Sequence, residues 1–341
     1  MKLYRYRPPT ELVFKELRYS ELYLAPPIEL NDPLDLNGQL NFFPSTSEEI
    51  EGLVQFLQRQ AFVAHGIENG CRMLKLMTVE RLAPFLTAPG RTNEPGIMSK
   101  DDLFDALRAF YRDCAEVDHA HVRLDAEVLT LALDDLFSQF LNNSAAVCFS
   151  ECANDFLMWS HYGGGHSGIC LEFEVDTEDD DADVAHLPLL YYGSLDRECV
   201  EWKGDLHRVM YANALTRLSF VDLLPVFLNA SDVDLMNLSK SYWHPYAEDI
   251  QRVFLEKPET WQTENEWRMV EVSFQSTLRE DRIRNYSPRA LTGVYFGERA
   301  SEGTRRRVRR IVDMYPNHPR VYECHVDGSR TLVIHASDGD T

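Results

Sequence analysis

Long hydrophobic runs are absent from this sequence, which argues against a protein that crosses a membrane with helices. No apolar run approaches the roughly 18 to 20 residues that a helix needs to span a bilayer. Residues 1–7 lack the apolar stretch and the small-residue cleavage site of a secretory signal. Internal repeats and low-complexity tracts are also missing. We therefore expect a globular, cytoplasmic protein that has no membrane partner.

Cysteine is sparse and positive charge is in deficit. The seven cysteines are an odd number and lie mostly in apolar contexts, which is typical of reduced, buried thiols. The chain has 34 Lys and Arg residues against 55 Asp and Glu residues, so its formal net charge is −21. Because an anionic surface repels phosphate backbones, nonspecific nucleic-acid binding is disfavoured over most of the surface.

Charge is unevenly distributed along the chain. An acidic run covers residues 176–183 and is typical of a solvated loop. A basic cluster, Arg305-Arg306-Arg307 and Arg309-Arg310, falls on a predicted helix at residues 302–314. Two interpretations of this cluster stay open: the solvated face of a helix, or a local surface that binds anions.

Hydrophobic periodicity predicts an α+β protein. Strands are predicted at residues 4–7, 21–25, 145–150, 168–175, 188–192, 268–273, 291–296, 320–325 and 331–335. Two blocks have helical periodicity, at residues 45–142 and 205–257. We interpret residues 1–341 as a single α+β domain, with a mixed or antiparallel β core that carries these two blocks as helical insertions.

Several short segments combine aromatic rings, ionisable groups and turn residues. They are Asn31-Asp32-Pro33, Cys148-Phe149-Ser150-Glu151, Met158-Trp159-Ser160-His161-Tyr162, the run from Gly168 to Phe173, and Glu264-Asn265-Glu266-Trp267-Arg268. In content and order they resemble a large prokaryotic family of unknown function. That resemblance implies no activity.

A second resemblance implies an enzymatic activity. Tyr4-Arg5-Tyr6-Arg7, then Ser150 or Tyr162, then Glu264-Asn265-Glu266 are similar to the three motifs that build one NAD pocket in the ADP-ribosyltransferase fold. The Glu-x-Glu spacing is similar to that of the Arg–Ser–Glu branch of these enzymes. The resemblance implies an ADP-ribosyltransferase-like core, NAD as the substrate, and a protein or nucleic acid as the acceptor. It also implies the setting of a toxin or phage-defence effector, with an antitoxin or a phage protein as a further partner.

This chemistry requires a carboxylate. Breaking the nicotinamide–ribose bond passes through a sugar cation, which a nearby carboxylate stabilises. We expect Glu266 in that role, with Glu264 positioning the acceptor, because two residues of one strand that are two apart share a face. The alternative is that both are surface carboxylates or partners of Arg268. Arg268 itself needs an acidic partner if buried, and Glu266 and Asp32 are the candidates.

The pyrophosphate and the nicotinamide require cations and aromatic walls. Arg5 or Arg7 supplies the guanidinium, and since the two share a strand face the sequence does not choose between them. Tyr162, Trp159 and Tyr6 are the candidate aromatic walls, with core packing as the alternative for Trp159 and Tyr6.

Ser150 and His161 complete the expected cofactor-binding residues. Ser150 would orient a ribose hydroxyl or the carboxamide, and its alternative is a capping or turn role. His161 precedes a Gly163-Gly164-Gly165 turn, which lacks the downstream Lys-Ser/Thr of a phosphate loop. No metal is expected, because His161, His166 and nearby cysteines do not have the spacing of a standard zinc site.

Two other functions stay open. One is a non-enzymatic sensor module that binds a nucleotide or a phage component through the same pocket. The other is a hydrolase that uses Glu264 and Glu266 as an acid/base pair. Release of nicotinamide from NAD distinguishes the transferase from the sensor module.

Overall fold

The structure is a computed structural model that describes residues 1–30, 39–87, 97–117, 130–131, 133–135, 142–177, 183–192, 199–213, 217–220, 254–271, 278–327 and 332–336. The Asn31-Asp32-Pro33 motif and most of the acidic run at residues 176–183 lie outside the described residues. Among the helices of the described ranges, none is both long and apolar enough to cross a membrane.

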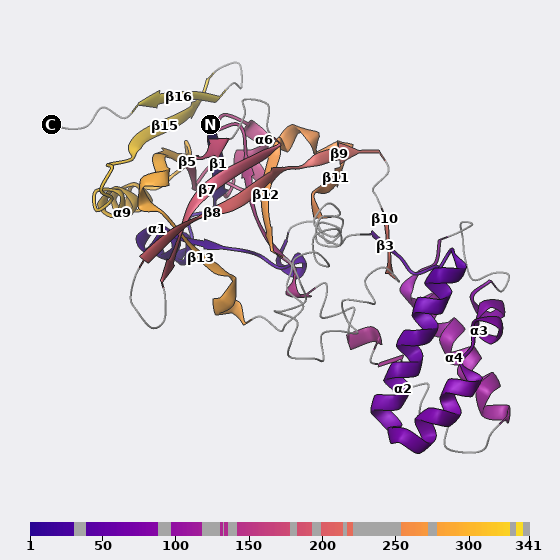
Figure 1. The fold of residues 1–341 in the computed structure, drawn as a ribbon. Helices are drawn as coiled ribbons and strands as arrows, with labels where there is room; N and C mark the ends of the chain where they lie inside the picture. The colour runs from indigo at the N-terminus through magenta and orange to yellow at the C-terminus, as the bar shows by residue number, and fades with distance from the viewer. Residues whose placement is uncertain are drawn as a thin grey trace.

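A 12-stranded mixed sheet forms the centre of the α+β fold (Figure 1). Its strands are, in order across the sheet, β16 (Leu332–Ala336), β15 (Arg320–Val326), β14 (Leu291–Phe296), β5 (Ile169–Glu174), β1 (Lys2–Arg7), β4 (Ala145–Ser150), β12 (Glu266–Glu271), β8 (Cys199–Arg208), β7 (Val184–Tyr192), β13 (Ile283–Tyr286) and β2 (Glu21–Tyr23), with β6 (Asp176–Thr177) beside β7. Neighbours are antiparallel except β14 and β15. Parallel neighbours need a crossover, and α9 (Glu302–Val312) supplies it.

The first strand of the chain lies in the middle of this sheet. β1 pairs with β5 along its whole length, from Lys2 opposite Glu174 to Arg7 opposite Ile169. Among the described residues, its register with β4 is limited to Tyr4 opposite Ser150. Beyond that pair the two strands diverge. There the chain after β2 pairs with β4 instead, through a bridge between Ala25 and Ala146.

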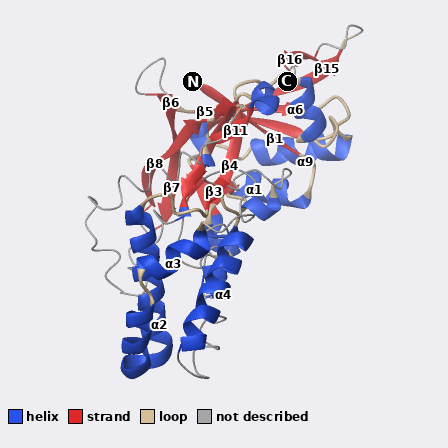
Figure 2. Ribbon diagram, turned by 90° about the vertical axis from the view of Figure 1, so that its right-hand side faces the viewer, coloured by secondary structure: helices blue, strands red, loops and turns tan. Residues whose placement is uncertain are grey.

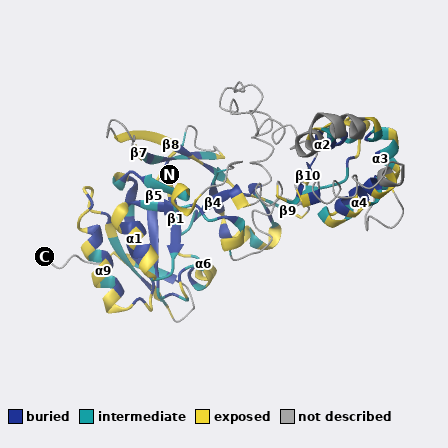
Figure 3. Cartoon of the chain, turned by 90° about the horizontal axis from the view of Figure 1, so that it is seen from below, coloured by how far each residue is buried: buried dark blue, intermediate teal, exposed yellow. Residues whose placement is uncertain are grey.

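Alternation along the central strands creates two different faces. Leu3, Leu171 and Phe296 belong to a large apolar core that also contains residues of α1 (Glu11–Tyr19) and α9. Their neighbours Tyr6, Cys170 and Tyr295 point to the other face, which α6 (Phe156–His161) covers. Figure 3 shows the buried central strands beneath the exposed outer sides of α1 and α9. Arg5 and Arg7 therefore lie on the α1 face of β1, and Tyr4 and Tyr6 on the α6 face.

A helical block extends away from the sheet (Figures 1 and 2). It follows β3 (Gln39–Asn41) and contains α2 (Ser47–Leu76), α3 (Val79–Leu86) and α4 (Lys100–Val117). Its own apolar core includes Phe56, Leu82 and Phe110, and it continues to Ala146 and Phe254 at the sheet. The predicted helical block at residues 45–142 therefore contains the helices expected there.

The second predicted helical block, at residues 205–257, is wrong for most of the residues that the structure describes there, although Phe220 and Phe254 are helical. β8 continues to Arg208, and β9 (Met210–Ala212), β10 (Arg217–Ser219) and β11 (Glu256–Pro258) follow. β9 pairs with β11, and β10 with β3. Gly204 and Leu206 are buried between exposed neighbours, which is the two-residue period of a strand. β9 and β10 are fixed by pairing with strands that are distant in the sequence, whereas β8 forms a hairpin with the preceding β7. Residues 221–253 lie outside the described ranges.

Gly168, just before β5, allows the closest approach between β1 and the turn after α6. A Cβ atom at this position would lie 2.1 Å from the Arg7 carbonyl oxygen and 2.9 Å from that of Gly163. We expect Gly168→Ala to lower the free energy of unfolding by at least about 2 kcal/mol, because backbone would have to move. Urea unfolding measures this. Gly303→Ala is the control, because its nearest atom is 3.7 Å away; equal losses in both variants would contradict the close approach.

Candidate functional site

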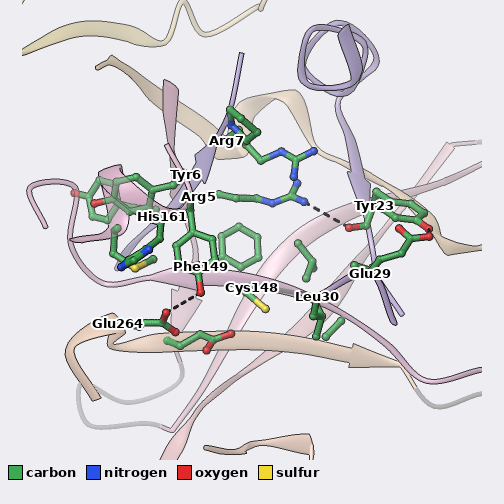
Figure 4. Close-up of a pocket in the computed structure, with 18 of the residues that line it drawn as sticks. Arg5, Tyr6, Arg7, Tyr23, Glu29, Leu30, Cys148, Phe149, His161 and Glu264 are labelled. Carbon is green, nitrogen blue, oxygen red and sulfur yellow. Dashed lines mark hydrogen bonds between the residues drawn. The ribbon is translucent and has the colours of Figure 1, made fainter. Parts of the chain in front are cut away.

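A cavity of about 340 Å³ opens where β1 and β4 diverge (Figure 4). Its walls come from residues far apart in the sequence: β1, the segment after β2, β4, the end of α6, and the region from β11 to β12. The volume lies at the lower end of the roughly 300–1,000 Å³ of small-molecule sites. Because the sheet is split here, β1 contributes residues from both of its faces.

One wall of the cavity carries an excess of positive charge. Arg5 and Arg7 face one carboxylate, Glu16 of α1: Arg7 Nη2 lies 2.7 Å from Glu16 Oε1, and Arg5 Nη1 lies 3.7 Å from Oε2. Arg5 Nη2 donates a long hydrogen bond of 3.5 Å to the Tyr23 carbonyl. Burial and the neighbouring Arg7 lower the pKa of Arg5 to about 10.

Arg5 has an incomplete set of partners. Only 7% of the residue is exposed, and its Nη1 has no hydrogen-bond partner among the described residues. A buried donor without an acceptor is unfavourable, and two guanidinium groups share one carboxylate. This wall therefore favours an anion in the cavity.

The opposite wall is built around Lys257. Its ammonium donates to Glu264 Oε2 at 2.6 Å and to Glu266 Oε2 at 2.9 Å, and it lies 5.0 Å from the Trp261 ring centre. The expectation that Glu264 and Glu266 share a strand is wrong. Glu264 ends a 3₁₀ helix, η3 (Glu259–Glu264), and Asn265 has a left-handed conformation with φ of 42° before β12 begins. Lys257, not a shared strand face, brings the two carboxylates together.

Glu266 is held firmly in its ionised form. Arg268, which is completely buried, donates from Nε to Oε1 at 2.8 Å and from Nη2 to Oε2 at 3.0 Å. Burial opposes ionisation, but Arg268 and Lys257 outweigh it and lower the pKa of Glu266 to about 2. The expectation that a buried Arg268 has an acidic partner is confirmed, and Glu266 is that partner. Asp32, the other candidate, lies outside the described residues.

Glu264 has the opposite shift. Burial raises the pKa of Glu264, and the nearby Glu266 charge raises it further. The Lys257 ammonium lowers this pKa, but by less than the other two effects raise it. The Tyr162 hydroxyl donates to Glu264 Oε1 at 2.8 Å. Burial and the Glu264 charge raise the pKa of Tyr162, so its hydroxyl stays protonated. Of the two carboxyl groups, Glu264 is therefore the better suited to accept and release a proton.

Two predicted cofactor-binding residues do not line the cavity. Ser150 is 1% exposed, and its hydroxyl donates to the Glu264 carbonyl at 2.8 Å. It holds the η3–β12 turn and thereby positions Glu264. Trp159, on the side of α6 that faces β1, is fully buried against Tyr6, and its indole nitrogen donates to the Ala153 carbonyl at 2.9 Å. For Trp159, core packing is the correct interpretation.

The other predicted residues line the cavity together. Arg5, Arg7, Tyr6, His161, Tyr162, Glu264 and Glu266 all contribute to its walls. The Tyr6 hydroxyl donates to the Cys152 carbonyl at 2.6 Å, so only its ring is presented to the cavity. His161 is exposed at the end of α6. In Figure 4, His161 and Glu264 lie toward one end of the cavity, and Tyr23 and Glu29 toward the other.

Sequence reasoning missed several charged or polar residues of this site, among them Lys257, Glu16, Tyr23 and Glu29. Lys257 and Glu16 are almost completely buried, and Tyr23 joins the cationic wall through its carbonyl group. Lys257 stands in a segment rich in aromatic and acidic residues, which was a usable signal. Glu16 had none, because an acidic residue in a short amphipathic helix is usually solvated.

Comparison with known proteins finds a family model that matches part of the chain, including part of this site. Residues 158–269, about a third of the chain, match a family described as "Protein of unknown function (DUF2971)". Tyr162, Lys257, Glu264, Glu266 and Arg268 lie within the matched range. No curated protein and no solved structure matches the chain.

The depressed pKa of Glu266 predicts an acid-sensitive contribution to stability. Because its folded-state pKa is about 2 against an ordinary 4.5, the contribution is fully present above pH 4.5 and is lost as the pH falls through 2. A shift of this size corresponds to about 3 kcal/mol. We expect the unfolding free energy of Glu266→Gln to fall less steeply between pH 5 and pH 2 than that of the wild type. Glu259→Gln, at an exposed position, should keep the wild-type slope; a shared slope in all three proteins would contradict the assignment.

Proposed function

We propose that the cavity binds NAD, breaks its nicotinamide–ribose bond and transfers ADP-ribose to a macromolecular acceptor. The observation that carries this proposal is the convergence of a buried arginine, whose Nη1 lacks a hydrogen-bond acceptor among the described residues, and the Glu264 carboxylate on one cavity. The first suits a pyrophosphate and the second suits a developing sugar cation.

Arg5 and Arg7 bind the pyrophosphate in this proposal. A phosphate oxygen would accept from the Arg5 and Arg7 guanidinium groups that line the cavity and balance the positive charge that Glu16 leaves uncompensated. The cavity volume suits part of a dinucleotide, so we assign the nicotinamide riboside to the cavity and the adenosine to its open side. Tyr6, Tyr162 and Phe149 present aromatic surface for the nicotinamide ring.

Glu264 carries the chemistry in this proposal. The bond between the pyridinium nitrogen and ribose C1′ breaks, and nicotinamide leaves as a neutral molecule with the bonding electron pair. The Glu264 carboxylate stabilises the sugar cation. The acceptor then attacks C1′, and its proton passes to Glu264. Glu266 is committed to Arg268 through both oxygens, so it acts as a positioning residue by holding Lys257.

A non-catalytic nucleotide-binding module is the second candidate. One observation favours it: the Lys257 ammonium touches both carboxylates and reduces their attraction for a sugar cation. The hydrolase has less support, because an acid/base pair needs two groups that exchange protons and Glu266 has a pKa of about 2. NAD binding without turnover would favour the module.

Glu264→Gln tests the catalytic assignment. The substitution keeps the shape and the Tyr162 contact but removes the charge, so nicotinamide release from NAD should fall by about 10²- to 10³-fold or more. Chromatography of released nicotinamide measures this. Glu259→Gln, at the exposed start of η3, is the matched control and should retain wild-type turnover. Full activity in a folded Glu264→Gln protein would remove this residue from the mechanism.

Arg5→Met tests the pyrophosphate contact. Methionine fills a similar volume without donors, so the KM for NAD should rise by about tenfold or more, because a charge-assisted bond is lost. Stability should change little, since a buried cation with incomplete partners is removed. Arg108→Met, on the exposed side of α4, is the control. An unchanged KM together with wild-type stability would place the anion elsewhere.

A further inference from the structure

A second concave surface lies between α1 and α9, on the outer side of α1. It encloses about 600 Å³. The two helices pack side by side on the sheet in each view of the fold (Figures 2 and 3). α1 separates this surface, which we call the α1/α9 groove, from the cavity. Glu16 of α1 is buried beside Arg5 and Arg7, whereas Lys15 and Arg18 are exposed and line the groove.

The five arginines of the basic cluster face two different parts of the structure. Arg305 and Arg309 turn toward β15: both pair with Glu323 and lie over the Phe296 ring, at 5.4 and 5.6 Å. These two are structural. Arg306, Arg307 and Arg310 instead line the groove.

Positive charge in the groove exceeds what the groove itself neutralises. Five cations line it (Lys15, Arg18, Arg306, Arg307 and Arg310), together with a single carboxylate, that of Glu11. Glu11 pairs with Arg307, 2.6 Å from Nη2 to Oε2. Within the described part of the chain, Arg18, Arg306 and Arg310 form no ion pair. This concentration of positive charge stands in a protein whose net charge is −21, so it marks a place where an anionic partner is attracted while the rest of the surface repels it.

The groove is also apolar in part. The Arg307 guanidinium lies 4.1 Å from the Phe14 ring centre, and Ile311 forms part of the lining. Tyr19 and Met314 are 57% and 61% exposed at its edge. Exposed apolar groups between cations suit a ligand that alternates carboxylate and apolar side chains. A nucleic acid offers phosphates instead and would extend beyond the groove over an anionic surface.

We propose that the α1/α9 groove is a docking site for an acidic peptide segment of a partner protein. Its carboxylates pair with Arg18, Arg306 and Arg310, and its apolar side chains lie on Tyr19 and Met314. The site is independent of the cavity and of the chemistry proposed there.

Fluorescence anisotropy with a labelled peptide that alternates glutamate and leucine tests this site. The full-length protein should bind the peptide, and added salt should weaken binding because exposed charges are screened. Arg306→Glu with Arg310→Glu should weaken binding by about tenfold or more, since each change replaces an attraction by a repulsion. Arg108→Glu with Arg112→Glu, also one helical turn apart and exposed on α4, is the matched control and should bind as the wild type does.

A third variant separates peptide docking from general attraction of anions. Met314→Ser should weaken binding of the glutamate–leucine peptide but not of a glutamate–serine peptide. Equal circular dichroism and thermal unfolding of all variants show that they are folded. The proposal is overturned if the folded wild type does not bind the peptide, or if the α9 double variant binds as tightly as the α4 control. It is also overturned if a thymidine oligonucleotide binds the groove more tightly than the peptide does.

Discussion

The ion pair between Arg268 and Glu266 is the interaction on which the candidate site depends. A completely buried guanidinium is tolerated only if its donors are satisfied, and Glu266 and the Phe254 carbonyl accept from all three nitrogens of Arg268. Because both Glu266 oxygens are engaged, Glu266 stays ionised and holds Lys257. Lys257 in turn draws Glu264 to the same point. The position of Glu264 in the cavity therefore follows from the buried Arg268–Glu266 ion pair of β12.

The two walls of the cavity differ in their balance of charge. At Lys257 and Arg268, two cations meet two carboxylates, so that wall is neutral when Glu264 is ionised. At Arg5 and Arg7, two cations meet one carboxylate, so that wall is left positive. The divergence of β1 and β4 makes room between them. A ligand with an anionic part and a part that becomes cationic would match both walls, and NAD is such a ligand in the function we propose.

Sequence reasoning identified the elements of this site better than their roles. The α+β class and the strands that carry Arg5 and Glu266 were predictable, because short alternating runs bounded by proline and turn residues favour strands. Ser150 and Trp159 were assigned to the ligand but turn away from the cavity, because burial depends on which elements pack above a strand. The strands β9 and β10 were missed for a related reason: their pairing partners, β11 and β3, lie far away in sequence. The composition around Lys257 gave a signal of a site, but the burial of Lys257 was not predictable, since a buried and an exposed lysine look alike in a sequence.

The central position of β1 has a consequence for how the protein is made. The strand leaves the ribosome well before its partners β4 and β5, which begin at Ala145 and Ile169. Contacts of such long sequence separation require a large loop to close, and this slows folding. The carboxylate wall is synthesised later still, at Lys257 to Arg268. A nascent chain therefore exposes an unpaired β1 until β4 and β5 have emerged, and it holds a complete cavity only after Lys257 to Arg268 have emerged.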